Sequence, residues 1–164
     1  MEVSIKSITL FSAILLTGLS AGLFYAWMVS VIPGTRKVID TTYLESMQSI
    51  NRAILNPAFF IVFMGSVVLL AISTIQHYQN GSLFWYLLVA TVTYLIGTFG
   101  VTIFGNVPLN DALDVLQLEE LSPSKMAQFR KSYESKWNRW HLIRTVFSVL
   151  SFIFALITLF SESN

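Results

Sequence analysis

Four long apolar runs, separated by polar connections, constrain the fold of this chain more than any other feature. They cover approximately residues 8–32, 57–76, 83–104 and 139–160. A helix of about 20 apolar residues crosses the hydrocarbon core of a bilayer. Lipid excludes irregular backbone and open sheet edges, because their polar groups would have no partners. The sequence therefore predicts an all-α membrane protein, in which residues 1–164 form one domain, a four-transmembrane-helix bundle.

The composition supports a membrane location and limits the possible chemistry. Charged residues make up 12% of the chain, about half of the roughly 25% that is usual in soluble domains. The net charge is +1 and no dense basic tract is present, so we expect membrane lipids and no nucleic acid as partners. The chain has no cysteine and two histidines, His77 and His141. Thiolate metal sites and cysteine nucleophiles are therefore excluded, and a transition-metal site would need several carboxylate ligands besides the histidines.

The first and third connections have helical patterns. Apolar residues follow one helical stripe between residues 41 and 55, at Leu44, Met47, Ile50 and Ile54. Asn56 followed by Pro57 is typical of an N-cap and a first helical residue. In the third connection Pro123 is expected to begin a helix that continues, without Gly or Pro, into the fourth run. The fold prediction thus includes amphipathic helices in the first and third loops.

The distribution of basic residues predicts the orientation in the membrane. Four spans place both chain ends on the side of the short second loop. The two long loops contain Arg36, Lys37, Arg52, Lys125, Arg130, Lys131, Lys136 and Arg139, whereas Lys6 lies on the other side. Basic residues are enriched in cytoplasmic loops. We therefore expect a multi-pass protein of a bacterial inner membrane with its long loops in the cytoplasm.

Small residues recur every four positions in the first run, at Gly18, Gly22 and Ala26. Such spacing gives a helix one smooth face that permits close packing against another helix. We expect a helix contact on this face, which would allow a homo-oligomer to form.

One helical face near the fourth run carries residues suited to catalysis. Trp137, His141 and Arg144 have the spacing i, i+4, i+7, and Asn138 borders the same face. An imidazole can act as a base near neutral pH, and a guanidinium can hold an oxyanion. The alternative is an interfacial belt, because Trp and Arg also anchor helices at the membrane boundary. That alternative explains His141 least well.

Two asparagines follow the third run, which we expect to end at Gly105. Asn106 and Asn110 are one helical turn apart and can point the same way. Asn106 precedes Pro108 and is alternatively the N-cap of a new helix. Asn51 adds a polar group at the same membrane end. His77 lies at the opposite end, and we expect it to be a solvated loop residue.

Four segments together resemble the DUF1772 membrane proteins. They are Gly22-Leu-Phe-Tyr-Ala-Trp27, Met47-Gln-Ser-Ile-Asn-Arg-Ala-Ile-Leu-Asn-Pro57, Gly105-Asn-Val-Pro-Leu-Asn110 and Trp137-Asn-Arg-Trp-His-Leu-Ile-Arg144. The resemblance extends in order over nearly the whole chain. The family includes fungal anthrone oxygenases, so it implies an oxygenase that needs no metal or flavin and uses O2 on an electron-rich phenolic or polycyclic substrate.

The resemblance also implies roles for individual residues. The expected catalytic residues are His141 as the base, with Arg144 and Asn110 at the enolate oxygen. The expected substrate-binding residues are Asn51, Asn106, Trp137, Asn138 and Trp140. The main alternative is a non-catalytic membrane module that binds lipid or quinone or serves as an accessory subunit. A carrier is the least supported, because the spans contain almost no ionisable residues.

Overall fold

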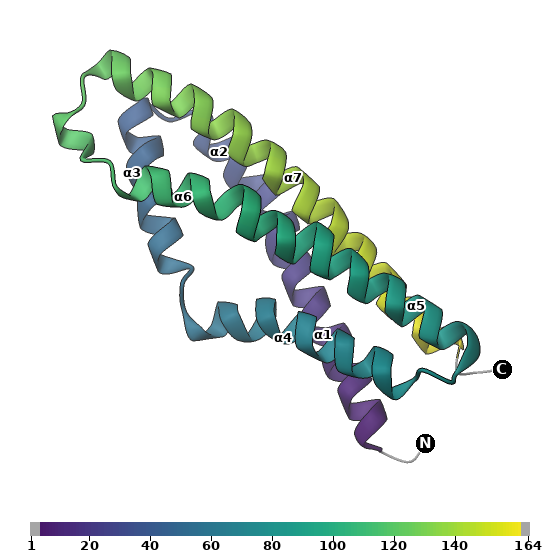
Figure 1. Cartoon of the computed structure of the whole chain (residues 1–164). Coiled ribbons are helices and arrows are strands. Elements are labelled where there is room, and N and C mark those ends of the chain that lie inside the picture. Colours follow the sequence, from purple (N-terminus) through teal and green to yellow (C-terminus); the bar gives the residue numbers. More distant parts are fainter. Residues whose placement is uncertain (1–3, 162–164) are drawn as a thin grey trace.

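The computed structural model describes residues 4–161, which form four long helical segments that lie alongside one another (Figure 1). The first segment is α1 (Ile5–Ala26), the π-helical turn η1 (Trp27–Val31) and α2 (Ile32–Thr35). The second is α4 (Pro57–Gln76). The third comprises α5 (Gly81–Val92), the π-helical segments η2 (Thr93–Gly100) and η3 (Thr102–Asn106), and α6 (Val107–Asp114). The fourth is α7 (Pro123–Ser161).

All four segments are long and apolar enough to cross a membrane. Between them lie α3 (Asp40–Ala53) and the short 3-10 turn η4 (Leu118–Glu120), and no strand occurs in residues 4–161. The start of α1, the end of α7 and the α4–α5 turn lie at one end of the bundle (Figure 1). The predicted all-α fold with four apolar spans is therefore confirmed.

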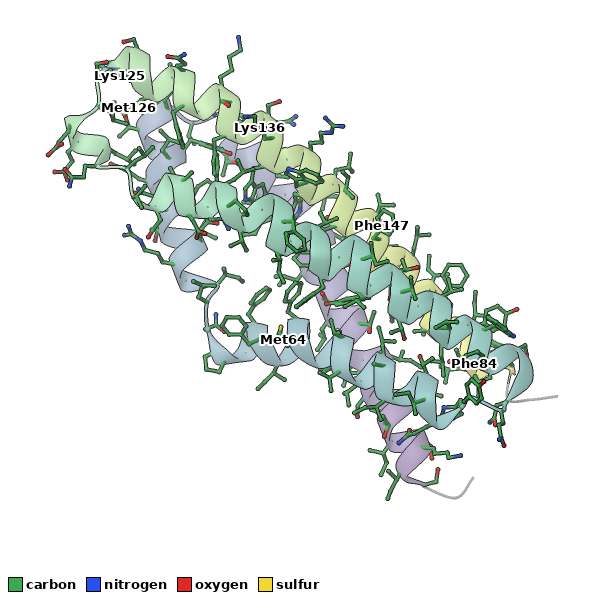
Figure 2. The ribbon with its side chains drawn as sticks, in the orientation of Figure 1. Met64, Phe84, Lys125, Met126, Lys136 and Phe147 are labelled. Atoms are coloured by element: carbon green, nitrogen blue, oxygen red, sulfur yellow. The ribbon has the colours of Figure 1, made fainter. Side chains whose placement is uncertain are left out.

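Two predicted helix starts are confirmed at Pro57 and Pro123. Asn56 caps α4, because its Oδ1 accepts a hydrogen bond of 3.0 Å from the backbone N–H of Phe59. Helix α7 begins at Pro123 and continues without a break for 39 residues. It therefore carries side chains both beside the long loops and inside the bundle. Lys125 and Lys136 project from its loop end (Figure 2).

The buried apolar residues form two clusters, one inside the bundle and one beneath the long loops. The first contains Leu10, Phe24, Phe63, Leu70, Leu87 and Tyr94. The second contains Tyr43, Leu44, Met47, Leu113, Tyr133 and Trp137. Burial of Leu44 and Met47 confirms the amphipathic character of α3. Outside the loop end, large apolar side chains such as Phe11, Ile61, Ile96 and Phe104 are exposed, as expected for surfaces that face lipid.

The third helix does not break at Gly105 as predicted, because it continues to Asp114. Pro108 removes a backbone donor and would clash within a regular α-helix. Directly before it, the backbone N–H of Val107 donates to the Thr102 carbonyl five residues earlier. The N–H of Ile32, just before Pro33, likewise donates to the Trp27 carbonyl. Each proline therefore follows a wide π turn, which lets the helix axis continue.

The prediction that His77 is solvated is also wrong. His77 is buried at the end of α4, and its Nδ1 donates to the Ser73 carbonyl at 2.8 Å. The ring folds back onto the last turn of its own helix, where the Ser73 carbonyl also accepts from the backbone N–H of His77 at 3.1 Å.

The small-residue face of α1 is used in part within the chain. A Cβ at Gly18 would lie 2.8 Å from Cε2 of Phe152 on α7, so this glycine permits a close helix contact. Gly22 has open space around the corresponding position. Association of two copies through the Gly18–Gly22 face stays a prediction.

Candidate functional site

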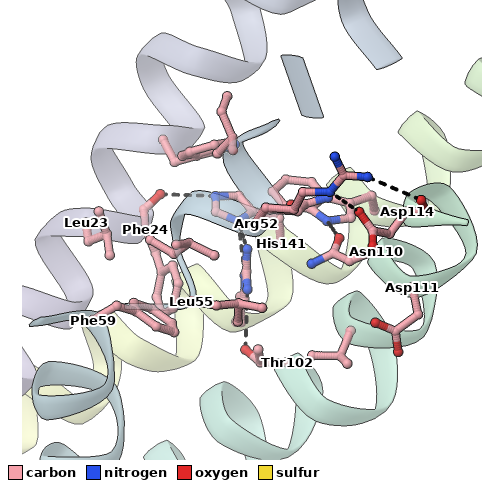
Figure 3. Close-up of a pocket in the computed structure, with 17 residues that line it drawn as sticks. Leu23, Phe24, Arg52, Leu55, Phe59, Thr102, Asn110, Asp111, Asp114 and His141 are labelled. Atoms are coloured by element: carbon pink, nitrogen blue, oxygen red, sulfur yellow. Dashed lines mark hydrogen bonds and ion pairs between the residues drawn. The ribbon is translucent and has the colours of Figure 1, made fainter. Parts of the chain in front are cut away.

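A cavity of about 200 Å³ lies at the loop end of the bundle, among α1, α3, α6 and α7 (Figure 3). Aromatic side chains of Phe24, Trp27, Phe59 and Trp137 form much of its wall. Its polar wall residues are Asn51, Arg52, Thr102, Asn110, Asp111, Asp114, His141 and Arg144. An engineered apolar cavity of about 150 Å³ takes up benzene. This cavity therefore has room for a ligand larger than one ring.

His141 and Arg144 form a buried pair in the cavity wall. Nε2 of His141 lies 3.1 Å from the Phe24 carbonyl. A carbonyl only accepts, so Nε2 carries the proton and Nδ1 presents a lone pair. Arg144 donates to that lone pair from Nε at 3.0 Å and from Nη2 at 2.9 Å. The ring of His141 is thus held neutral and in one tautomer between a backbone carbonyl and a guanidinium.

Arg144 is only 8% exposed, and no carboxylate in residues 4–161 lies within ion-pair distance of it. Its guanidinium carbon lies 4.6 Å from the ring centre of Phe24 and 5.1 Å from that of Trp137. Besides His141, it has one weak partner, the Thr102 hydroxyl at 3.5 Å. Arginine has five N–H donors, so some remain available. A buried charge without a counterion is costly, and a ligand oxygen in the cavity would reduce that cost.

A hydrogen-bonded chain orients Asn110. Its Oδ1 accepts from the indole N–H of Trp137 at 2.8 Å and from the Tyr133 hydroxyl at 3.3 Å. The Tyr133 hydroxyl in turn accepts from Nδ2 of Asn51 at 3.2 Å. With its oxygen occupied, Asn110 presents its Nδ2 donor at the cavity wall. Trp137 also stacks on His141, with ring centres 5.0 Å apart and planes 9° apart.

The structure brings together five of the eight predicted site residues. Asn51, Asn110, Trp137, His141 and Arg144 all line the cavity. Because Trp137, His141 and Arg144 are buried, they do not form the interfacial belt that was the alternative.

The other three predicted residues lie outside the cavity wall. Asn106 is not an N-cap. It is fully buried within the helix, donates from Nδ2 to the Trp137 carbonyl at 3.2 Å, and leaves its Oδ1 without a partner. Trp140 packs over Gly105, where a Cβ would lie 2.6 Å from Cδ2 of the indole. Asn138 is half-buried and, like Trp140, does not line the cavity.

Several wall residues were not predicted from the sequence. Phe24 contributes both its ring and its carbonyl, and its place in the Gly22–Trp27 segment was the available signal. Thr102 lies one and two helical turns before Asn106 and Asn110, so its spacing could have identified it. Arg52 and Asp114 form an ion pair of 2.5 Å between α3 and α6 at the cavity edge (Figure 3). Nothing in the sequence pattern indicated this pairing.

Arg130, near the start of α7, holds the loop end against the bundle. It donates to Asp40 at 2.9 Å, to Glu134 at 3.1 Å and to the Val38 carbonyl at 2.7 Å. Its guanidinium carbon lies 4.5 Å from the ring centre of Tyr43 on α3. Burial raises the pKa of the Tyr43 hydroxyl well above its usual value. These contacts hold α3, one wall of the cavity, in place.

Comparison with known proteins identifies the family. The sequence profile described as anthrone oxygenase matches residues 47–154, which is more than half of the chain and runs from within α3 to near the end of α7. No curated protein and no solved structure matches the chain. Within residues 4–161, no group of three or more His, Asp or Glu side chains could hold a metal ion. The chain, with its four apolar spans, therefore belongs to the anthrone oxygenase (DUF1772) family of multi-pass membrane proteins.

Proposed function

We propose that this protein is a membrane oxygenase that uses neither metal nor flavin and oxidises a planar hydroxyaromatic compound such as an anthrone. The main support for this proposal is Arg144, a buried cation without a carboxylate partner in the wall of an aromatic cavity. Family membership supports the same reaction class.

The reaction needs a site that stabilises an enolate. Loss of a proton from the methylene carbon of an anthrone places negative charge on the ring oxygen. Arg144 and the Nδ2 of Asn110 line the same cavity and supply donors for that oxygen. The electron-rich carbon then reduces O2 and forms a C–O bond, and the peroxide anion takes back the proton held by His141 to give a hydroperoxide. Elimination of water leaves a ketone, so O2 is the only oxidant and no external reductant is required.

His141 is the proposed base, and its proton acceptor is Nδ1. Arg144 donates to this atom. A substrate oxygen that takes over the Arg144 donors frees the Nδ1 lone pair for the carbon-bound proton. The Nε2–H remains on the Phe24 carbonyl, which holds the ring in place and stabilises its protonated form. The enolate formed between the two groups offsets their like charges.

A non-catalytic quinone or lipid binder is the second candidate. The observation that favours it is that Nδ1 of His141 already accepts hydrogen bonds from Arg144. This nitrogen therefore has no free lone pair with which to act as a base. In this case Arg144 would hold a quinone carbonyl and no oxygen would be consumed.

We further propose that the cavity lies at the cytoplasmic end of a bacterial inner-membrane protein. The support is the excess of Lys and Arg in the two long loops. Single cysteines at Lys125 and Gln79 in this cysteine-free chain test the orientation, because only the residue on the periplasmic side should react with an impermeant maleimide in intact cells.

The decisive experiment measures O2 uptake and quinone formation with a dihydroxyanthrone, using purified protein in nanodiscs. We expect turnover by the parent and loss of turnover in His141→Ala and Arg144→Met. The exposed Arg139, which lies on the same helix but outside the cavity wall, provides the matched control Arg139→Met. Quenching of tryptophan fluorescence by the same compound reports binding separately. Binding without oxygen uptake by the parent would refute the oxygenase and support the binder.

A further inference from the structure

The rim of the cavity has two chemically different sides. Its exposed apolar members are Leu23 at 39%, Leu55 at 66% and Val107 at 39%. Its exposed charged members are Arg52, Asp111 and Asp114. Exposed aliphatic side chains beside a cavity are unfavourable in water, so we expect this side of the rim to contact an apolar environment.

The apolar side lies at the height where the spans begin. Leu55 immediately precedes Asn56 and Pro57, which start α4. Val107 is the first residue of α6, at the end of the third apolar run. Arg52 precedes Leu55 by three residues, and Asp114 follows Val107 by seven residues at the end of α6. The ion pair between Arg52 and Asp114 therefore lies on the charged side of the rim.

Helix packing leaves room on the apolar side. Helix α4 packs chiefly on α1 and α5, whereas α3 packs on α6 and α7. The α3–α4 corner lies opposite α6 (Figure 1), and the cavity is lined from both sides, by Leu55 at the corner and by Val107 on α6. Buried Arg144 and half-buried Asn110 line the same cavity, so a ligand that enters past the apolar residues meets polar groups inside.

We propose that the cavity is loaded from the bilayer, through a portal between Leu55 and Val107, and that its ligand is an amphipathic aromatic compound dissolved in the membrane. The oxygen-bearing ring of the ligand reaches Arg144, and its apolar end remains in the portal. This inference rests on the proposed function only in taking the cavity as the site of an aromatic ligand.

The test uses the absence of native cysteine. Single cysteines are placed at Leu55 and Val107, and at Val92 as a control on an exposed apolar position of α5 outside the cavity wall. Each variant in nanodiscs is labelled with a bulky maleimide or left unlabelled. Two substrates with the same dihydroxyanthrone ring are compared, one with an alkyl chain and one with a sulfonate group.

We expect a label on Leu55→Cys or Val107→Cys to lower turnover of the alkyl substrate about tenfold relative to the same variant without label. The Val92→Cys variant should keep the parental rate with and without label. The comparison within each variant separates the effect of the label from any effect of the cysteine itself. The rate should follow the mole fraction of alkyl substrate in the lipid, and the sulfonated compound should be a poor substrate.

Two results would contradict the proposed portal, and one of them would leave the proposed oxygenase function intact. In the first, both substrates turn over equally, and a label on Asp111→Cys inhibits whereas a label on Leu55→Cys does not. This result would place the entrance on the charged side of the rim and leave the proposed function intact. If the unlabelled parent neither binds nor oxidises either compound, the proposed function fails and the portal falls with it.

Discussion

Two arginines of α7, Arg130 and Arg144, are buried to nearly the same extent but have opposite kinds of partners. Arg130 donates to two carboxylates and to backbone carbonyls of the first connection. Arg144 donates to a neutral imidazole and a hydroxyl and lies over two aromatic rings. The first arrangement satisfies a buried charge within the protein. The second leaves that charge to be satisfied by a ligand. Arg130 is therefore a residue that stabilises the fold, and Arg144 is a residue of the proposed site.

The largest expected effect is on catalysis by Arg144→Met. Loss of one donor to a developing oxyanion costs about a hundredfold to a thousandfold in rate, and quinone formation in nanodiscs should fall by that amount. The thermal midpoint should stay the same or rise, because an uncompensated buried charge has been removed. A large drop in the midpoint with unchanged turnover would mean that Arg144 stabilises the fold and is not needed for the reaction.

Next in size is the loss of stability in Arg130→Met. This change leaves Asp40, Glu134 and several carbonyls without their donor, and we expect a cost of about 2 kcal/mol because the two carboxylates are partly exposed. Thermal unfolding in detergent should show a lower midpoint. Ligand binding, measured by tryptophan quenching below that midpoint, should remain. An unchanged midpoint would mean that these contacts contribute nothing to stability.

Tyr133→Phe tests whether Tyr133 is a positioning residue for Asn110. The change removes the hydroxyl that joins Asn51 to Asn110, and loss of a hydrogen bond worth about 1 kcal/mol corresponds to roughly a fivefold effect. We expect weaker substrate binding, seen as a higher KM with a smaller change in kcat. Tyr43→Phe is the matched control, since Tyr43 packs against Tyr133 but does not line the cavity. Equal effects of the two substitutions would indicate a packing role.

The smallest expected effect concerns Tyr43 beneath Arg130. Burial raises its pKa in the folded state, so above a pH of about 10 the unfolded chain loses this proton first. The stability that Tyr43 contributes is complete below that pH and declines as the pH rises through the folded pKa. Tyr43→Phe should therefore flatten the fall of the thermal midpoint between about pH 9 and 11. A parallel fall in both proteins would contradict this origin.

The parts of the fold that follow from local patterns were predictable. Span number, the Asn56 cap and the shared face of Trp137, His141 and Arg144 depend on residue type and helical period alone. Trp137 and Trp140 show the limit of that reasoning, because both are tryptophans in one short segment. Only packing decides that one lines the cavity and the other covers Gly105.

Other features depend on contacts that no local pattern encodes. The partner of His141 is the carbonyl of Phe24, and that of Asn51 is Tyr133. The N-cap alternative for Asn106 rested on Pro108, because a proline normally marks a helix start. In the structure a π turn accommodates Pro108 within one helix. His77 was misread because a short polar turn usually exposes its side chains, and here the ring returns to its own helix.

The π turn at Thr102–Asn106 has a consequence for the length of this part of the chain. A π turn contains one residue more than an α turn, and one residue corresponds to about 100° of rotation around the helix axis. The angular position of Asn110 relative to Arg144 is thus determined by how many residues precede it, independently of their identity. A deletion of one residue here would keep every functional side chain and still turn α6 away from the cavity.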